Sequence, residues 1–234
     1  MSTLLEASPP HASIYAMSQR KTALVLGEHY HIYNRGVDKR SIFEDPDDVR
    51  RFLKVMEVFN TRNSVGSLYE YLHLKKSEGH QPNPLIEFVA YCLNPNHYHF
   101  ILSPLVEKGV EQFMQRLGTG YTMYFNNKYE RSGALFQGVF KSSHIDSNEY
   151  LLRVSAYVNL NNRAHQLGGL ASKLVRSSWD EYVSSKARNG FCNKEIVLSQ
   201  FASPKEYSQF ALSALKDILL RKQEEKDLQK LLID

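Results

Sequence analysis

The spacing of apolar residues predicts alternating strands and helices over the first two-thirds of the chain. A first strand is expected over 24–37, where Tyr30 and Ile32 alternate with His31 and a turn signal follows. The segment 45–48 (DPDD) then has the acids and the proline typical of a helix start. The other expected elements are a helix over 49–59, strands over 86–92 and 97–102, a helix over 110–125, an extended segment over 135–145 and a helix over 150–165.

This order of elements predicts the fold class. Strand, helix, strand, strand, helix, strand, helix is the order of an antiparallel sheet with helices packed on it, so we expect an α+β, ferredoxin-like fold. Residues 1–22 are rich in Ser, Pro and Ala and predict a poorly ordered lead-in. The core domain is expected over 23–168, with a short helix at 68–74. Residues 169–234 are expected to form a helical C-terminal extension, which ends in a charged helix over 212–232.

Composition and charge are those of an ordinary globular protein. Hydrophobic residues make up 42% and charged residues 23% of 234, enough for a sizeable core without disulfides. Cys92 and Cys192 have no paired spacing, which indicates a reducing, cytoplasmic compartment. The sequence has neither a run long enough to span a membrane nor a recognisable signal peptide, so no membrane partner is expected. The net charge of +4 permits a nucleic-acid partner without requiring one.

The first chemical signal is the tripeptide His97-Tyr98-His99. Side chains alternate along a strand, so the two imidazoles point to one face and can converge on one cation, while Tyr98 points to the other. Such a pair alone also fits two ordinary polar residues on a strand. Its context favours a metal site, because the preceding strand, 88–93, is almost wholly apolar.

The second signal is a tyrosine and an asparagine on the helix expected over 150–165. Tyr157 and Asn161 are four residues apart and therefore share a helix face. An asparagine carbonyl oxygen suits Mg²⁺ or Mn²⁺, and a neighbouring phenol oxygen would then lie near a metal-bound phosphate. The alternative is that Tyr157 belongs to the core and Asn161 to the surface.

Five segments together resemble one family. They are 30–37 (YHIYNRGV), 94–100 (NPNHYHF), 124–133 (YFNNKYERSG), 138–143 (GVFKSS) and 157–161 (YVNLN). In this order they resemble the REP-associated tyrosine transposases, relatives of the single-tyrosine HUH transposases. The resemblance covers roughly residues 28–182.

The resemblance implies a function and assigns roles to residues. His97 and His99 would be the HUH metal ligands, Asn161 the third ligand of Mg²⁺ or Mn²⁺, and Tyr157 the nucleophile. The 23–168 core would be the HUH catalytic domain. The enzyme would cleave and rejoin single-stranded DNA near hairpins (REP-like palindromes) through a 5′-phosphotyrosine intermediate. By the same resemblance, the chain would act as a monomer or as a homodimer.

Basic residues near these segments are the candidate DNA contacts. Such groups can hold phosphates, and the neighbouring aromatic residues can stack on bases. Each residue singly also fits a solvated charged surface. The candidates are Arg35, Lys39, Arg40, Lys128, Arg131 and Lys141.

Two other functions compete with this interpretation. Two-histidine phosphoesterases also carry two short histidine motifs, and His-Tyr-His occurs here at both 29–31 and 97–99. They need Ser or Thr at the third position of each motif, where this chain has His31 and His99, so we reject that class. A non-catalytic hairpin-binding protein on the same scaffold is the main alternative, and such a protein would not need the two histidines, the tyrosine and the asparagine together.

Overall fold

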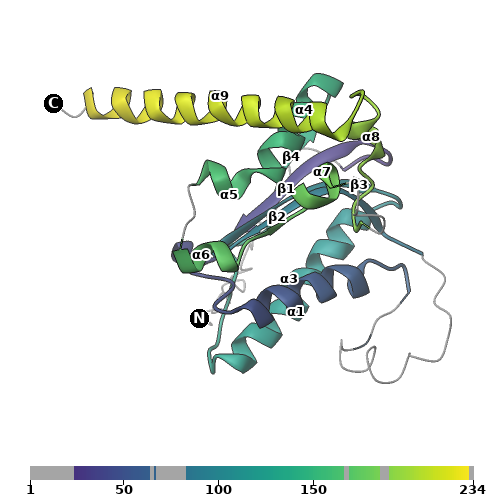
Figure 1. The fold of residues 1–234 in the computed structure, drawn as a ribbon. Helices are drawn as coiled ribbons and strands as arrows, with labels where there is room; N and C mark the ends of the chain where they lie inside the picture. The colour runs from purple at the N-terminus through teal and green to yellow at the C-terminus, as the bar shows by residue number, and fades with distance from the viewer. Residues whose placement is uncertain (1–23, 64–65, 67–82, 166–168, 185–189, 232–234) are drawn as a thin grey trace, which may run out of the picture.

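The computed structural model describes residues 24–63, 66, 83–165, 169–184 and 190–231 (Figure 1). The lead-in expected at 1–22 and the short helix expected at 68–74 lie outside these residues. The strands are β1 (His29–Arg35), β2 (Ile86–Asn94), β3 (His97–Pro104), β4 (Lys141–Ile145) and β5 (Arg176–Ser177). The helices are α1 (Pro46–Phe59), α3 (Gly109–Lys128), α4 (Asn148–Asn159), α5 (Asn161–Ala164), α6 (Gly169–Lys173), α7 (Trp179–Val183), α8 (Glu195–Leu198) and α9 (Pro204–Leu231), with a 3-10 turn at Val37–Lys39.

The strands form one antiparallel sheet in the order β4-β1-β3-β2-β5. The first four follow the order of a ferredoxin-like sheet, which confirms the predicted fold class. The short β5 adds a fifth strand at the edge beside β2, so the C-terminal region contributes directly to the sheet. The two central strands, β1 and β3, are those that carry the histidine motifs.

Helices cover both faces of the sheet, with α1 and α3 on one side and α4 and α9 on the other (Figure 1). Alternation along β3 explains this arrangement. Tyr98 and Phe100 belong to the apolar cluster under α1 and α3, while Ile101 belongs to the cluster under α4. His97 and His99 therefore lie on the α4 side, together with the chain that follows that helix.

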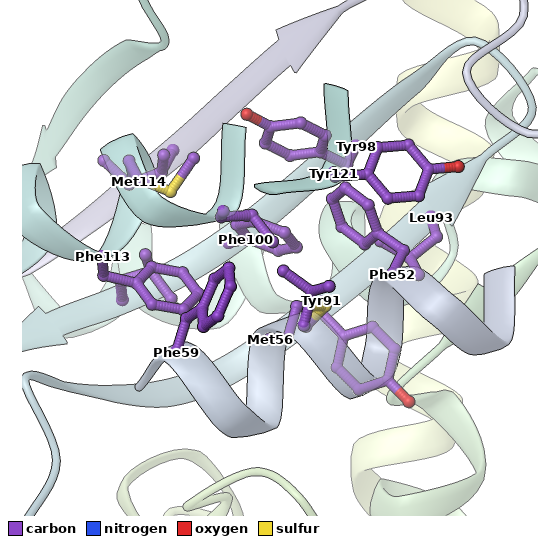
Figure 2. Packing of buried hydrophobic residues seen from close by; sticks show 14 of the residues in the cluster. Phe52, Met56, Phe59, Tyr91, Leu93, Tyr98, Phe100, Phe113, Met114 and Tyr121 are labelled. Atoms are coloured by element: carbon purple, nitrogen blue, oxygen red, sulfur yellow. The ribbon is translucent and has the colours of Figure 1, made fainter. Parts of the chain in front are cut away.

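The core under α1 and α3 is rich in aromatic side chains (Figure 2). Phe52 of α1 lies fully buried between the rings of Phe43, Tyr98 and Tyr121, with ring centroids 4.8 to 5.6 Å apart. The helix begins as predicted, because Asp45 caps it in a reciprocal capping box and Pro46 is its first residue. This apolar layer packs against the face of the sheet opposite the one that carries His97 and His99.

Four element boundaries differ from the predictions. The first strand begins at His29, because Gly27 adopts a positive φ of 76° and turns the chain before it. Only 141–145 of the extended segment pairs as a strand, and Gly138, with a φ of 67°, precedes it. The last helix begins at Pro204, eight residues before its expected start.

The fourth difference bears on the site. The helix expected over 150–165 is divided at Leu160, which caps α4 and precedes the short α5. Leu160 has a φ of −110° and a ψ of 16°, and it stands between Asn159 and Asn161. Asparagine disfavours a helix interior because its side chain competes for backbone hydrogen bonds. Asn161 therefore begins a new helix and does not continue the turn that carries Tyr157.

Candidate active site

An open cavity of about 530 Å³ lies over the start of β3. His97 and His99 line it from that strand, and Tyr157 lines it from α4. His99 is 7% exposed and His97 is half-buried. The two imidazole rings stand nearly perpendicular, with centroids 5.2 Å apart. The structure thus brings the two histidines and the tyrosine singled out from the sequence into one cavity.

Asn161 reaches the same cluster from the start of α5. Its Oδ1 lies 3.1 Å from Nε2 of His97 and accepts a hydrogen bond of 2.7 Å from Nδ2 of Asn94. The same Asn94 nitrogen lies 3.0 Å from Nε2 of His97. Asn94 is the last residue of β2, so its side-chain amide links β2 to His97 of β3 and to Asn161 of α5. The division of the helix at Leu160 does not separate Asn161 from the histidines.

The tautomer of His97 follows from its neighbours. Asn96 donates through Nδ2 to the carbonyl oxygen of Lys39, which turns its Oδ1 toward Nδ1 of His97 at 2.6 Å. Nδ1 must then carry the proton, and Nε2 is an acceptor. Nε2 of His97 and Oδ1 of Asn161 therefore each present a lone pair, and both lone pairs point to the side-chain amide of Asn94.

This donor set fits a divalent cation. Two ligands at right angles on a cation, each about 2.1 Å from it, stand about 3.0 Å apart. That is close to the 3.1 Å between His97 Nε2 and Asn161 Oδ1. The Asn94 amide hydrogens take up the same two lone pairs here. Within the part of the chain that is described, no three His, Cys, Asp or Glu side chains are arranged to hold a metal ion, so a cation at this site would depend on the asparagine.

Tyr157 stands edge-on to the histidines. Its ring centroid lies 5.5 Å from that of His99 and 6.0 Å from that of His31, at 79° and 85°. Burial raises the pKa of the phenol above its ordinary value of 10.0, and the side chain of Asn161 opposes this shift by favouring the phenolate. Because the net direction is upward, the phenol needs help to lose its proton when it acts as a nucleophile.

His31, which the sequence predicts as a strand residue near the site, is a member of this cluster. Its Nε2 lies 2.8 Å from Nδ1 of His99, and the two rings are stacked with centroids 5.1 Å apart. Tyr33 stacks on both rings, at 5.0 Å from His31 and 5.7 Å from His99. Burial lowers the pKa of His31 to about 4, so its imidazole is neutral near pH 7.

The candidate DNA contacts fall into two groups. Arg35, Lys39 and Lys141 line the cavity beside the histidines, and all three are exposed. Arg35 is hydrogen-bonded through Nε to Gln137, which lines the same cavity. These three cations give the cavity a positive edge suited to phosphates.

The other three candidates lie away from the cavity. Arg40 and Arg131 border a separate hollow beside α3. Lys128 is held by two carboxylates, at 2.7 Å from Asp45 Oδ2 and 2.7 Å from Asp48 Oδ1. Asp48 is fully buried, so Lys128 neutralises a charge inside the fold.

Behind Tyr157, a buried polar network fixes the end of α4. Asn159 donates through Nδ2 to the Tyr207 hydroxyl at 2.8 Å and accepts from the Ser178 hydroxyl at 2.6 Å. Ser178 in turn accepts from the backbone amide of Tyr91 in β2. All of these side chains are buried, so the network ties α4 to α9, to the start of α7 and to the sheet.

Several of these residues, Asn94 and Asn96 among them, were missed from the sequence. His31 was predicted near the site, and the doubled His-Tyr-His motif is the signal for it. Asn94 and Asn96 flank the expected turn at Pro95 and were interpreted as turn formers alone. Their contacts with Asn161 and His97 depend on how β2, β3 and α5 meet.

Comparison with known proteins assigns the family. The family model described as transposase IS200 like matches residues 25–161, which is more than half of the chain. The chain therefore belongs to the IS200-like transposase family. The match includes His97, His99, Tyr157 and Asn161, and it ends before α9.

Other comparisons add less. A solved structure of a REP-associated tyrosine transposase bound to a REP hairpin is similar, with 17% sequence identity and a TM-score of 0.48. The similarity covers 72% of this chain and 87% of that chain. No curated protein matches the chain. Among the described residues, no helix combines the length and the apolar character needed to cross a membrane.

Proposed function

We propose that this chain is a metal-dependent transposase that cleaves and rejoins single-stranded DNA near hairpins, with Tyr157 as the nucleophile. The observation that carries the proposal is the meeting of Tyr157, His97, His99 and Asn161 at one cavity with a positive edge. The chain's place in the IS200-like family supports the same reaction class. The two buried free cysteines fit a reducing compartment, so we propose the cytoplasm as the location of the activity.

The chain's own residues bind the DNA strand and supply the nucleophile. Arg35, Lys39 and Lys141 bind backbone phosphates at the edge of the cavity and orient the strand. The Tyr157 oxygen attacks the scissile phosphorus, the bond to the 3′ oxygen breaks, and a 5′-phosphotyrosine and a 3′ hydroxyl result. The phenol loses its proton and the leaving oxygen gains one. Attack by a 3′ hydroxyl on the phosphotyrosine reverses these steps and reseals a strand without ATP.

The metal has one role in this scheme. Mg²⁺ or Mn²⁺, held by His97, His99 and Asn161, would offset the negative charge that develops on the phosphate oxygens. The rigid setting of these ligands is the protein's contribution, since preorganised charge costs no rearrangement during the reaction. Asn96 orients His97 by accepting its Nδ1 proton.

The decisive experiment is a covalent-adduct assay. Purified protein is incubated with labelled single-stranded hairpin oligonucleotides and Mn²⁺ and separated on a denaturing gel. The wild type should give a labelled protein band that is absent from Tyr157→Phe. Tyr150→Phe is the matched control, because Tyr150 lies on the same helix, 39% exposed, and should leave the band intact.

The other outcomes discriminate against the proposal. A band that persists in Tyr157→Phe and disappears in Tyr150→Phe would move the nucleophile to Tyr150. Tight hairpin binding without any adduct, over a pool of hairpins, would favour the non-catalytic binding protein. A band of equal strength in chelator would show that the reaction does not depend on a metal.

A further inference from the structure

His31 and His99 form a pair across the two central strands. Their β1 and β3 positions are diagonal neighbours, since Tyr33 pairs with His99 and His31 with Ile101. Alternation puts both imidazoles on the α4 face of the sheet. The 2.8 Å distance between His31 Nε2 and His99 Nδ1 is that of a good hydrogen bond. One of the two nitrogens must therefore donate and the other accept.

The direction of this hydrogen bond follows from the role of His99. A neutral imidazole that binds a cation through one nitrogen carries its proton on the other. If His99 binds through Nε2, its Nδ1 carries the proton and donates to His31. His97 is arranged in the same way, with its Nδ1 proton directed to Asn96 Oδ1. Each candidate ligand thus has one acceptor next to its Nδ1, an amide oxygen for His97 and an imidazole nitrogen for His99.

We propose that His31 is a positioning residue of the active site: its Nε2 accepts the Nδ1 proton of His99 and so directs Nε2 of His99 toward the catalytic cation. This inference rests on the proposed function and deepens it. His31 also packs against the edge of the Tyr157 ring. One side chain therefore restrains both a metal ligand and the nucleophile, and the first His-Tyr-His motif acquires a role distinct from that of the second.

Two substitutions separate the hydrogen bond from simple packing. In His31→Gln the terminal amide oxygen lies three bonds from Cβ, as Nε2 does, and can accept from His99. In His31→Asn the side chain is one bond shorter and cannot reach. His29→Asn is the matched control, because His29 lies two residues earlier on the same strand face, at the register position opposite Ile145 of β4. His97→Ala serves as the control for metal binding itself.

The measurement is Mn²⁺ affinity by isothermal titration calorimetry on the full chain. We expect His31→Asn to weaken Mn²⁺ binding about 10- to 100-fold and His31→Gln to remain near the wild type. His29→Asn should not change the affinity, and His97→Ala should lose it. The tautomer of His99 is read independently from two-bond ¹H–¹⁵N NMR spectra, which should place its proton on Nδ1 in the wild type.

Failure of this inference is distinct from failure of the proposed function. If His97→Ala abolishes Mn²⁺ binding and His31→Asn leaves it unchanged, His31 has no positioning role and the proposed function stands. If His31→Asn and His31→Gln weaken Mn²⁺ binding equally, His31 contributes by packing alone. A wild-type protein without Mn²⁺ binding would overturn both. If His31→Asn does not fold, a wild-type spectrum with the His99 proton on Nε2 would still overturn the inference.

Discussion

The two faces of the sheet are covered alike by helices but bury different chemistry. Under α1 and α3 lies a continuous layer of aromatic and aliphatic side chains (Figure 2). Under α4 and α9 the apolar cluster is interrupted by fully buried polar side chains, among them Asn94, Asn159, Asn161 and Ser178. The sheet is thus apolar on one side and partly polar on the other, and only the polar side carries the site.

This difference shows how the fold separates stability from chemistry. Burying an amide is unfavourable unless its hydrogen bonds are satisfied, so each polar side chain on the α4 face constrains its neighbours. The side chains on the apolar face need no partner in a particular direction, and they stabilise the fold mainly through burial of apolar surface. We expect substitutions on the two faces to differ in which property they change first.

The largest effect is expected on the apolar face. Phe52→Ala removes a fully buried ring that contacts three others, and it should lower the free energy of unfolding by about 3–5 kcal/mol. Urea denaturation followed by circular dichroism measures the change. Met123→Ala is the control, since Met123 is 68% exposed on α3 and should change stability by less than about 0.5 kcal/mol.

The same variant tests whether the faces are separate. Adduct formation by Phe52→Ala, corrected for the fraction of folded protein, should match that of the wild type. A loss of adduct much greater than the unfolded fraction would show that the aromatic layer also sets the geometry of the site, and the comparison of the two faces would break down.

An intermediate effect is expected on the polar face. Asn159→Ala removes two buried hydrogen bonds, although Tyr207 keeps Ser155 and Ser178 keeps the Tyr91 backbone as partners, so it should cost about 2 kcal/mol. Because Asn159 lies two residues after Tyr157, adduct formation should also fall by more than the loss of folded protein explains. Asn162→Ala, at a half-buried position, is the control, with a cost of about 0.5 kcal/mol or less.

The adduct formed by Asn159→Ala would show in one of two ways how the two faces of the sheet differ. Reduced adduct formation in the folded fraction would show that the polar network positions the nucleophile. Full activity in the folded fraction would mean that the network only stabilises the packing of α9 on α4, as the apolar layer stabilises the opposite face.

Local patterns in the sequence explain why much of the fold was predictable. Period-two alternation around Tyr30 and Tyr98 and helical spacing after Asp45 depend on neighbouring residues alone, and they predicted the sheet, the helices packed on it and the ferredoxin-like order. The shared face of His97 and His99 followed from the same alternation. Helix boundaries were less predictable, because the division at Leu160 depends on its packing as well as on the asparagines around it.

Contacts between distant segments were not predictable from one sequence. His31 and His99 are 68 residues apart, and Asn94 and Asn161 are 67 apart. No periodicity links such positions, since their contact results from strand order and helix docking. Lys128 shows the converse: its charge and its place near aromatic residues suggested a DNA contact, whereas its carboxylate partners lie about 80 residues away.

Lys128 gives the smallest expected effect, in its cluster with Asp45 and Asp48 beside the apolar face. Lys128→Met removes the cation that neutralises Asp48, while Tyr129 still donates to that carboxylate. We expect a loss of about 1–2 kcal/mol in the free energy of unfolding. Hairpin affinity, measured by a gel shift at fixed salt, should stay unchanged. Arg40→Met, at an exposed position outside the cavity, is the matched control. A weaker hairpin affinity in Lys128→Met alone would restore Lys128 as a phosphate contact.

The pH dependence of this cluster provides a further check on the same variant. The hydrogen bond from Lys128 holds the pKa of Asp45 below its ordinary value of 3.8. A carboxylate with a lowered pKa in the folded state contributes stability above 3.8, and that contribution disappears as the pH falls through the folded pKa. The stability difference between the wild type and Lys128→Met should therefore narrow when urea unfolding is repeated well below pH 3.8. A difference that stays constant with pH would mean that the Lys128 stem stabilises the protein by packing, as the neighbouring aromatic layer does, and that its charge contributes little.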